Sequence, residues 1–239
     1  MTLKTFPFLT IIPLFFLFAC QEAPKKKKTV QPQKVAAKDT ISVDSVTTSE
    51  EKEEDSFELT DDNAVNFFYK YNKTLTENKV RLTTRFGTIT IQLFDNVPYH
   101  KANFIYLTKK GYFDNTMFHR VVKGFIIQGG NADNKETGIK RSKIGRYVLP
   151  PDAHKGHRHD RGIVSMPSSE IDNPHMLASP YEFFIVVTKP GSYHLDGDYT
   201  PFGKVIDGMD VVDKINAQPV GDGDWPMQNI YILKAEVVK

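Results

Sequence analysis

The chain has 239 residues, of which 40% are hydrophobic, so it is long and apolar enough to bury one sizeable core. Its 31 lysines and arginines nearly balance its 29 aspartates and glutamates, and the net charge of +2 excludes nucleic acid as an expected partner. The single cysteine excludes an internal disulfide.

The N-terminus has the pattern of an export signal. An apolar stretch, Phe6–Ala19, follows a short basic region and is shorter than the roughly 20 residues that a helix needs to span a bilayer. It ends in the sequence LFAC, which resembles a bacterial lipobox. In such a sequence residues 1–19 are removed as a signal peptide, and the new N-terminal residue, here Cys20, is acylated.

The lipobox resemblance implies a lipid bilayer as a partner, reached through acylated Cys20. It places the protein in the bacterial cell envelope, lipid-anchored and extracytoplasmic, because several acyl chains together anchor a protein stably. The alternatives are an uncleaved anchor and a plain secretory signal whose cysteine is incidental. Residues 20–60 contain a lysine run, polar residues and an acidic cluster, and this composition predicts a disordered tether.

Residues 61–78 are predicted to form a helical extension ahead of the main domain. Thr60, Asp61 and Asp62 supply hydrogen-bond acceptors and negative charge for the start of a helix. The apolar and aromatic residues that follow are Val65, Phe67, Phe68 and Tyr71. We expect the helix to pack its aromatic residues on the outside of the domain. The alternative is that they cover the surface of a partner protein.

A hairpin and a helix are predicted at the start of the main domain. Val80–Arg85 and Thr88–Phe94 alternate apolar and polar residues around a glycine, which predicts two paired strands with one buried face. A helix is predicted from about Pro98 to Lys110, because proline stands near its first turn and a glycine follows its last. Phe104 and Leu107 are its expected core residues.

The stretch Phe118–Gly130, FHRVVKGFIIQGG, places Arg120 on an apolar strand before a turn at Gly124. A permanently cationic side chain is costly to hold among apolar residues unless its donors are used, which favours a functional role. The alternative is that Arg120 lies on the polar face of an alternating strand, with its guanidinium in water. The strand pattern alone does not decide between the two.

Beyond this stretch the sequence predicts several short strands and one further helix. Residues 131–143 are polar and contain glycine, as in a long surface loop. The expected strands are Gly162–Met166, Glu182–Thr188, Phe202–Val205 and Ile230–Val238, and the expected helix is Gly208–Asn216. Many short strands with only two substantial helices favour an antiparallel barrel, since closure removes exposed sheet edges.

Two other polar groups in the sequence predict neither a cofactor nor a nucleophile. The first comprises His154, His157, His159 and Asp160. Its spacing fits no closed zinc pattern, and its basic neighbours disfavour a cation. The second comprises Ser165 and Ser168, near strand ends, for which no residue marks a partner in nucleophilic catalysis. We therefore expect neither a metal nor another cofactor.

The thirteen positions of Phe118–Gly130 resemble the signature of the cyclophilin-type peptidyl-prolyl cis/trans isomerases. The resemblance extends over about residues 79–239, which form the expected isomerase domain. It implies a mainly β fold, a closed eight-stranded antiparallel barrel capped by two helices. The helix predicted within residues 61–78 is then an extra N-terminal element.

The same resemblance implies the residues of the active site. Those implied in catalysis are Arg120, Phe125 and Gln128. Those implied in substrate binding are Ile126, Pro167, Ser168, Glu182, Phe184, His194, Leu195 and Tyr199. Gln128 is expected to hydrogen-bond the substrate backbone. Because adjacent strand residues face opposite ways, we expect Phe184 in the proline pocket and Phe183 in the core.

The chain departs from the family pattern at three places around the groove. Family members that cyclosporin inhibits have a tryptophan that binds the drug, and His194 stands at that position here. The resemblance therefore does not imply that cyclosporin inhibits this protein. Glu182 replaces a usual glutamine and adds a negative charge. Pro167 and Ser168 replace an Ala-Asn pair, and the segment Ser169–Tyr181 is longer than in the short members. Because of these departures, the resemblance does not imply which substrates the groove prefers.

Prolyl isomerisation needs neither a nucleophile nor a metal, so such a site is sufficient for catalysis. The barrier of about 18 to 20 kcal/mol arises from the loss of amide resonance as the C–N bond twists. A guanidinium beside an apolar wall stabilises the twisted amide by donating to its nitrogen and lying close to its carbonyl oxygen. The sequence thus predicts an isomerase of Xaa-Pro bonds that binds proline-containing polypeptides and assists the folding of exported proteins.

Two alternatives from other functional classes stay open at this point. One is a non-catalytic module that binds proline-containing peptides on the same fold. The other is a scaffold of the cell envelope whose helix within residues 61–78 docks a partner. Fold alone does not separate these functions from catalysis.

Overall fold

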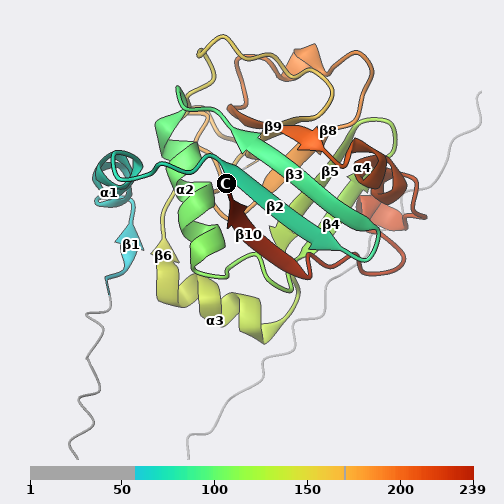
Figure 1. Ribbon diagram of the computed structural model, residues 1–239, viewed down its shortest axis with the longest axis horizontal. Coiled ribbons are helices and arrows are strands. Elements are labelled where there is room, and N and C mark those ends of the chain that lie inside the picture. The colour runs from blue at the N-terminus through green and yellow to red at the C-terminus, as the bar shows by residue number, and fades with distance from the viewer. Residues whose placement is uncertain (1–56, 170) are drawn as a thin grey trace, which may run out of the picture. The chain divides into compact units, whose positions relative to one another are not determined.

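Eight strands form one antiparallel sheet (Figure 1). The computed structural model describes residues 57–169 and 171–239, so the predicted signal peptide, Cys20 and most of the tether lie outside the described residues. The strands are β2 (Lys79–Thr84), β3 (Gly87–Leu93), β4 (Met117–Val122), β5 (Ile126–Asn131), β7 (Ile163–Ser165), β8 (Phe183–Val186), β9 (Pro201–Asp207) and β10 (Lys234–Val238). Their order across the sheet is β10-β2-β3-β9-β7-β8-β5-β4.

The two edge strands, β10 and β4, are linked through the segment that precedes β10. Met117 of β4 forms an antiparallel bridge with Tyr231. The backbone N–H of Phe118 donates to the Ile230 carbonyl at 2.8 Å, next to this bridge. These links are local, and no continuous ladder joins the two edges within the described residues. The mainly β architecture with eight antiparallel strands is confirmed, whereas complete closure of the barrel stays a prediction.

Aromatic residues fill the core between the sheet and helix α2 (Pro98–Lys109). Phe104 and Leu107, the predicted core residues of this helix, are fully buried. The ring of Phe104 lies 5.4 Å from that of Phe183 in β8 and 5.2 Å from that of Phe202 in β9, measured between centroids. Such aromatic contacts add to the stabilisation that burial of each ring provides.

A second helix, α4 (Met209–Asn216), lies at the other side of the sheet in Figure 1, near the place that the sequence predicted. It packs against β3, β4 and β5. Gly87, which begins β3, comes so close to Val211 that an added Cβ would lie 2.8 Å from a methyl group of that valine. Glycine is therefore required at this turn for the helix to reach the sheet.

One predicted loop is wrong: residues 131–143, expected as a surface loop, contain helix α3 (Lys135–Ile144). The side chain of Asn134 accepts a hydrogen bond from the backbone N–H of Thr137 and caps the helix. The side chain of Arg141 donates to the Tyr112 hydroxyl at 2.8 Å and ties the helix to the domain. The helix is mostly polar, so it lacks the apolar periodicity by which helices are recognised in a sequence.

The predicted N-terminal helix is present as α1 (Ala64–Asn72), but Asn63 precedes it instead of the expected Thr60–Asp62 cap. Phe68 is fully buried, and Phe67 lies 5.1 Å from the ring of Tyr106 in α2. The expectation that these aromatic residues pack on the outside of the domain is confirmed.

The folded unit begins earlier than predicted. Leu59–Thr60, which were assigned to the tether, form strand β1 and pair in parallel with β6 (Gly145–Arg146). Leu59 is fully buried. Gly145 has a φ of +125°, and an added Cβ there would clash with the backbone of Leu59. The last residues of the predicted tether therefore belong to the domain.

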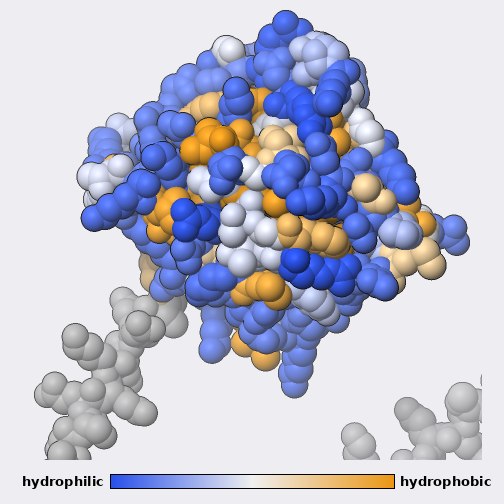
Figure 2. All heavy atoms as spheres, turned by 45° about the vertical axis from the view of Figure 1, so that its right-hand side comes forward, coloured by the Kyte–Doolittle hydropathy of each residue, from blue (hydrophilic) through white to orange (hydrophobic). Residues whose placement is uncertain are grey.

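Exposed apolar side chains are distributed over separate elements. Large examples are Phe57 before β1, Ile139 in α3 and Ile206 in β9. On the face drawn in Figure 2, apolar surface occurs in patches surrounded by hydrophilic residues. Across residues 57–169 and 171–239, no helix has both the length and the apolar character that crossing a bilayer requires.

His100 in α2 is fully buried, and neither of its ring nitrogens has a hydrogen-bond partner among the described residues. Burial lowers the pKa of His100 from 6.5 to about 3, because the charged ring is excluded from an apolar environment. The unfolded chain therefore binds a proton at pH values where the folded chain does not.

We expect the free energy of unfolding to fall as the pH drops from about 6.5 towards 3, by roughly 1 kcal/mol per pH unit from His100 alone. His100→Leu should reduce this slope, since it removes the titrating group. Urea unfolding followed by circular dichroism at several pH values measures the slope. His154→Leu, the same change at an exposed position, should keep the slope of the natural protein. An unchanged slope in His100→Leu would contradict the assignment.

Candidate active site

Arg120 owes its position to a bulge in the pairing of β4 with β5. Phe118 pairs with Gly129 and Arg120 pairs with Gln128, so His119 is an extra residue in β4. Such a bulge re-aims the side chains beside it. As a result Arg120 and Gln128 lie directly opposite each other and both line one groove.

The turn between these strands is held by Asn216 of α4. Its side-chain oxygen accepts from the backbone N–H of Gly124 at 2.8 Å, and its amide donates to the carbonyl of Val122 at 2.9 Å. These bonds fix the turn that carries Phe125. At the far end of β5, Gly130 has a φ of +101°, and an added Cβ would clash with the neighbouring backbone. The glycine there is required by this close approach.

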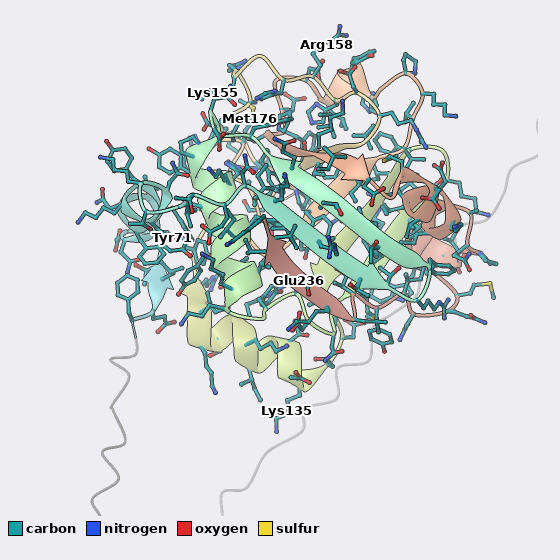
Figure 3. The ribbon with its side chains drawn as sticks, viewed as in Figure 1. Tyr71, Lys135, Lys155, Arg158, Met176 and Glu236 are labelled. Carbon is teal, nitrogen blue, oxygen red and sulfur yellow. The ribbon has the colours of Figure 1, made fainter. Side chains whose placement is uncertain are left out.

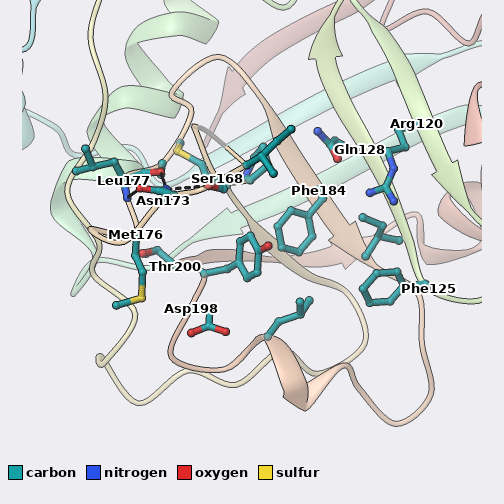
Figure 4. A pocket seen from close by; sticks show the side chains of 17 residues that line it. Arg120, Phe125, Gln128, Ser168, Asn173, Met176, Leu177, Phe184, Asp198 and Thr200 are labelled. Carbon is teal, nitrogen blue, oxygen red and sulfur yellow. Dashed lines mark hydrogen bonds between the residues drawn. The ribbon is translucent and has the colours of Figure 1, made fainter. Parts of the chain in front are cut away.

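The groove has a volume of about 500 Å³ and collects most of the predicted site residues. The predicted residues that line it are Arg120, Phe125, Ile126, Gln128, Pro167, Ser168, Phe184, Leu195 and Tyr199. Figure 4 shows Arg120, Gln128 and Phe125 on one side of it, with Phe184 further in. Only Glu182 and His194 of the predicted groove residues do not line it.

The floor of the groove is apolar. Phe184 is only 3% exposed and belongs to a small cluster with Ile126 and Leu195. The ring of Tyr199 meets the ring of Phe184 edge-on, with centroids 5.6 Å apart. Phe183, next to Phe184, lies in the main core, as the alternation along the strand predicted. The floor offers a surface on which a proline ring can be buried.

His194 and Glu182 support groove residues from outside. The ring of His194 is exposed and stacks on the ring of Phe125, with centroids 5.4 Å apart. Glu182 lies behind Gln128, whose side-chain Nε2 donates to its carboxylate at 2.8 Å. His119 Nε2 lies 3.4 Å from the same carboxylate oxygen. Burial alone would raise the pKa of Glu182, but the hydrogen bonds from His119 and Gln128 outweigh it and hold the pKa below its ordinary value.

Residues 171–178, part of the long segment noted in the sequence, form the opposite wall of the groove. The sequence showed the length of that segment but not this position. Asn173 organises the wall: its amide donates to the hydroxyl of Ser168 and to the carbonyl of Leu177, and its oxygen accepts from the Leu177 N–H. Figure 4 shows these bonds with Met176 close by. The further lining residues that were not predicted are Met166, Ile171, Asn173, Met176, Leu177, Ala178, Asp198 and Thr200.

A carboxylate that the sequence did not single out approaches Arg120. Asp224 Oδ2 lies 3.3 Å from the Nη2 atom of Arg120. Asp224 has a φ of +63°, a backbone conformation that only a few non-glycine residues adopt. The two side chains are 42% and 38% exposed, so solvent weakens the ion pair and a bound ligand can replace it.

Ser165 belongs to a chain of hydrogen bonds that its neighbours in the sequence do not reveal. The hydroxyl of Ser165 lies 3.0 Å from Nε2 of His159, and Nδ1 of His159 lies 2.7 Å from Oδ1 of Asp196. Ser165 and His159 are fully buried, so this chain of hydrogen bonds holds β7 to the segment before Leu195 and does not reach a substrate. Burial lowers the pKa of His159 below its ordinary value, although the bond to Asp196 opposes this shift.

The other histidines of the predicted polar group have separate contacts. His157 stacks on Phe94, with ring centroids 3.7 Å apart, and its Nε2 lies 2.7 Å from Oδ1 of Asn96. In the described part of the chain, no three histidine, cysteine, aspartate or glutamate side chains gather closely enough to hold a metal ion.

We expect Asp196→Ala to lower the free energy of unfolding by about 1 to 3 kcal/mol, because it leaves two buried donors unpaired. These are the backbone N–H and the ring Nδ1 of His159. Denaturant unfolding measures the change. Asp207→Ala, at an exposed position at the end of β9, is the matched control and should change stability by less than about 0.5 kcal/mol. Equal effects of the two substitutions would show that the Asp196 bonds contribute nothing.

Comparisons with known proteins point to one family. The family model "Cyclophilin type peptidyl-prolyl cis-trans isomerase/CLD" matches residues 79–237. The chain is 38% identical to the peptidyl-prolyl cis-trans isomerase CYP18-1 of Arabidopsis thaliana, an alignment that covers 66% of this chain and 94% of that protein. It is also 36% identical to the peptidyl-prolyl cis-trans isomerase-like 2 of Rhizopus delemar, but spans only 30% of that longer protein.

Solved structures agree. A cyclophilin-type peptidyl-prolyl cis-trans isomerase of Cryptosporidium parvum is similar with a TM-score of 0.58 and 30% identity, over 68% of this chain and 98% of that one. The structure of the same protein in the presence of the dipeptide Ala-Pro gives a TM-score of 0.57. With a family model matching most of its length and relatives covered almost end to end, the chain belongs to the cyclophilin-type peptidyl-prolyl cis/trans isomerases.

Proposed function

We propose that this isomerase acts on Xaa-Pro bonds of exported proteins and assists their folding from a lipid-anchored position in the bacterial cell envelope. The observation that carries the catalytic part is the position of Arg120 and Gln128, opposite each other above an apolar floor. The cellular part rests on the sequence of the first twenty residues, which lie outside the described residues.

The groove supplies what the twisted prolyl bond requires. As the C–N bond rotates, its nitrogen regains a lone pair, and a donor placed there stabilises the twisted state more than the planar one. The guanidinium of Arg120 is such a donor. The apolar side chains of Phe125 and Phe184 exclude water, which strengthens the interaction.

Proline-containing polypeptides are the proposed partners. A proline ring matches the apolar floor of Ile126, Phe184 and Leu195 in size and character. The structural neighbour determined with Ala-Pro supports this choice of ligand class. The proposed catalysis needs no metal or other cofactor, since it depends on one donor and the exclusion of water.

A non-catalytic module that binds proline-containing peptides is the second candidate function. The observation in its favour is the ion pair between Arg120 and Asp224, which occupies part of the guanidinium. The exposure of this pair favours the enzyme, because a substrate can displace a solvated carboxylate at little cost. Substitution of Arg120 separates the two functions.

We expect Arg120→Ala to lower the catalysed rate about a hundredfold to a thousandfold, comparable to the loss of one preorganised donor in other enzymes. Peptide affinity should fall much less, because the apolar floor still buries the proline ring. Arg120→Lys should restore only part of the rate, since an ammonium lacks the planar fork of donors. Exchange NMR spectroscopy of a short Xaa-Pro peptide measures rate and affinity together.

Arg81→Ala, which removes an exposed arginine from β2, is the control and should leave the rate unchanged. If Arg120→Ala kept nearly the full exchange rate, the catalytic assignment would fall and the binding module would replace it.

We expect Cys20→Ser to move the protein from the membrane fraction to the soluble fraction, or to leave its signal peptide uncleaved. The reason is that serine offers no sulfur for acylation. Fractionation of bacterial cells and labelling with a radioactive fatty acid measure both effects. Arg120→Ala should stay in the membrane fraction, since it changes the domain alone. A processed Cys20→Ser protein that remained on the membrane would rule out the lipid anchor.

A further inference from the structure

Glu182 accepts a hydrogen bond from a side chain that lines the groove. Its carboxylate lies behind Gln128 and accepts a hydrogen bond from Nε2 of that residue at 2.8 Å. The strand pairing explains the proximity: Gln128 in β5 is paired with Phe184 in β8, two positions after Glu182. Gln128 itself lines the groove, while Glu182 does not. Glu182 can therefore act on a substrate through Gln128.

An ionised carboxylate accepts hydrogen bonds and cannot donate one. The amide of Gln128 donates to one oxygen of Glu182, and Nε2 of His119 lies 3.4 Å from the same oxygen, so the polar groups around this carboxylate suit its ionised form. The Gln128 amide must then turn its NH₂ group to Glu182. Its carbonyl oxygen, Oε1, is left to face the groove. A glutamine at position 182 would fix no such direction, because an amide both donates and accepts.

We infer that Glu182 is a positioning residue that fixes Gln128 with its carbonyl oxygen towards the substrate, so that Gln128 accepts a hydrogen bond from a backbone N–H beside the proline. The inference rests on the proposed function of the groove. The prolyl nitrogen has no hydrogen, so the donor belongs to a neighbouring residue of the substrate. The groove then offers the two polar contacts in complementary form, with Arg120 as donor and Gln128 as acceptor.

Peptides that lack one backbone N–H test the inference. In an ester analogue, an oxygen atom replaces one amide N–H and the shape of the peptide is nearly unchanged. Two such analogues of one Xaa-Pro peptide, with the ester before Xaa or after proline, are compared with the parent peptide by exchange NMR spectroscopy. The protein is the full-length chain in detergent.

We expect one of the two esters to lower kcat/KM about fivefold to twentyfold, as the loss of a hydrogen bond to a groove acceptor does. In Glu182→Gln the amide of Gln128 is free to rotate and can meet either peptide. The kcat/KM of the parent peptide should then exceed that of the ester by less than about threefold. Glu236→Gln removes the same charge from an exposed position of β10 (Figure 3) and should keep the ratio of the natural protein.

The side-chain amide signals of Gln128 give a second readout that does not depend on activity. In the natural protein, one Nε2 proton should exchange slowly with water and be shifted downfield by the carboxylate. Glu182→Gln should lose both properties, and Glu236→Gln should keep them. Glu182→Ala, which also removes the carboxylate, replaces Glu182→Gln if that variant fails to fold, with the same expected results.

The outcomes separate the inference from the proposed function. If the natural protein accelerates exchange but neither ester is impaired, or the ester ratio is the same in Glu182→Gln, the inference is overturned and the isomerase stands. If the natural protein accelerates no exchange, the proposed function fails, and the amide signals still decide how Gln128 is oriented. Amide signals unaffected by the loss of the carboxylate would also overturn the inference.

Discussion

The pairing of β4 with β5, with one extra residue at His119, is the constraint on which the rest of the site depends. It sets Arg120 opposite Gln128, although an uninterrupted ladder would place the strand in a different register. The contacts around it serve this pairing. Asn216 holds the turn, and Gly130 allows the neighbouring backbone to approach β5. The catalytic geometry is thus carried by backbone pairing and does not depend on flexible side chains alone.

The two polar side chains that face the substrate each contact a carboxylate, and these two carboxylates differ in how far they are buried. Asp224 meets Arg120 in solvent, where an ion pair is weak and exchangeable. Glu182 meets Gln128 in a more buried position, and a hydrogen bond to a charged group is strong and directional. The guanidinium is consequently free to leave its partner for a peptide, while the amide keeps one orientation. The difference in burial thereby assigns a mobile role to one residue and a fixed role to the other.

Sequence predicted those features that the residue type itself determines. The apolar strand around Arg120 left its role open, and the resemblance of Phe118–Gly130 to the cyclophilin signature identified it. Alternation along β8 separated Phe184 from Phe183. The predictions failed where tertiary contacts decide. Helix α3 is polar and is held by a cap and by contacts with the domain. No periodicity of apolar residues therefore indicates this helix in the sequence. The partners of Arg120 and His159 lie far along the chain, and no local spacing relates Asp224 or Asp196 to them.

The most direct measurement of the central claim, that Arg120 acts on a proline held over Phe184, is a crystal structure of the protein with a short Xaa-Pro peptide. We predict the proline ring on the floor formed by Phe184 and Leu195, and a guanidinium nitrogen of Arg120 within about 3 Å of the peptide carbonyl oxygen. A proline ring bound outside this groove, or an Arg120 that stayed paired with Asp224 and away from the peptide, would contradict the claim.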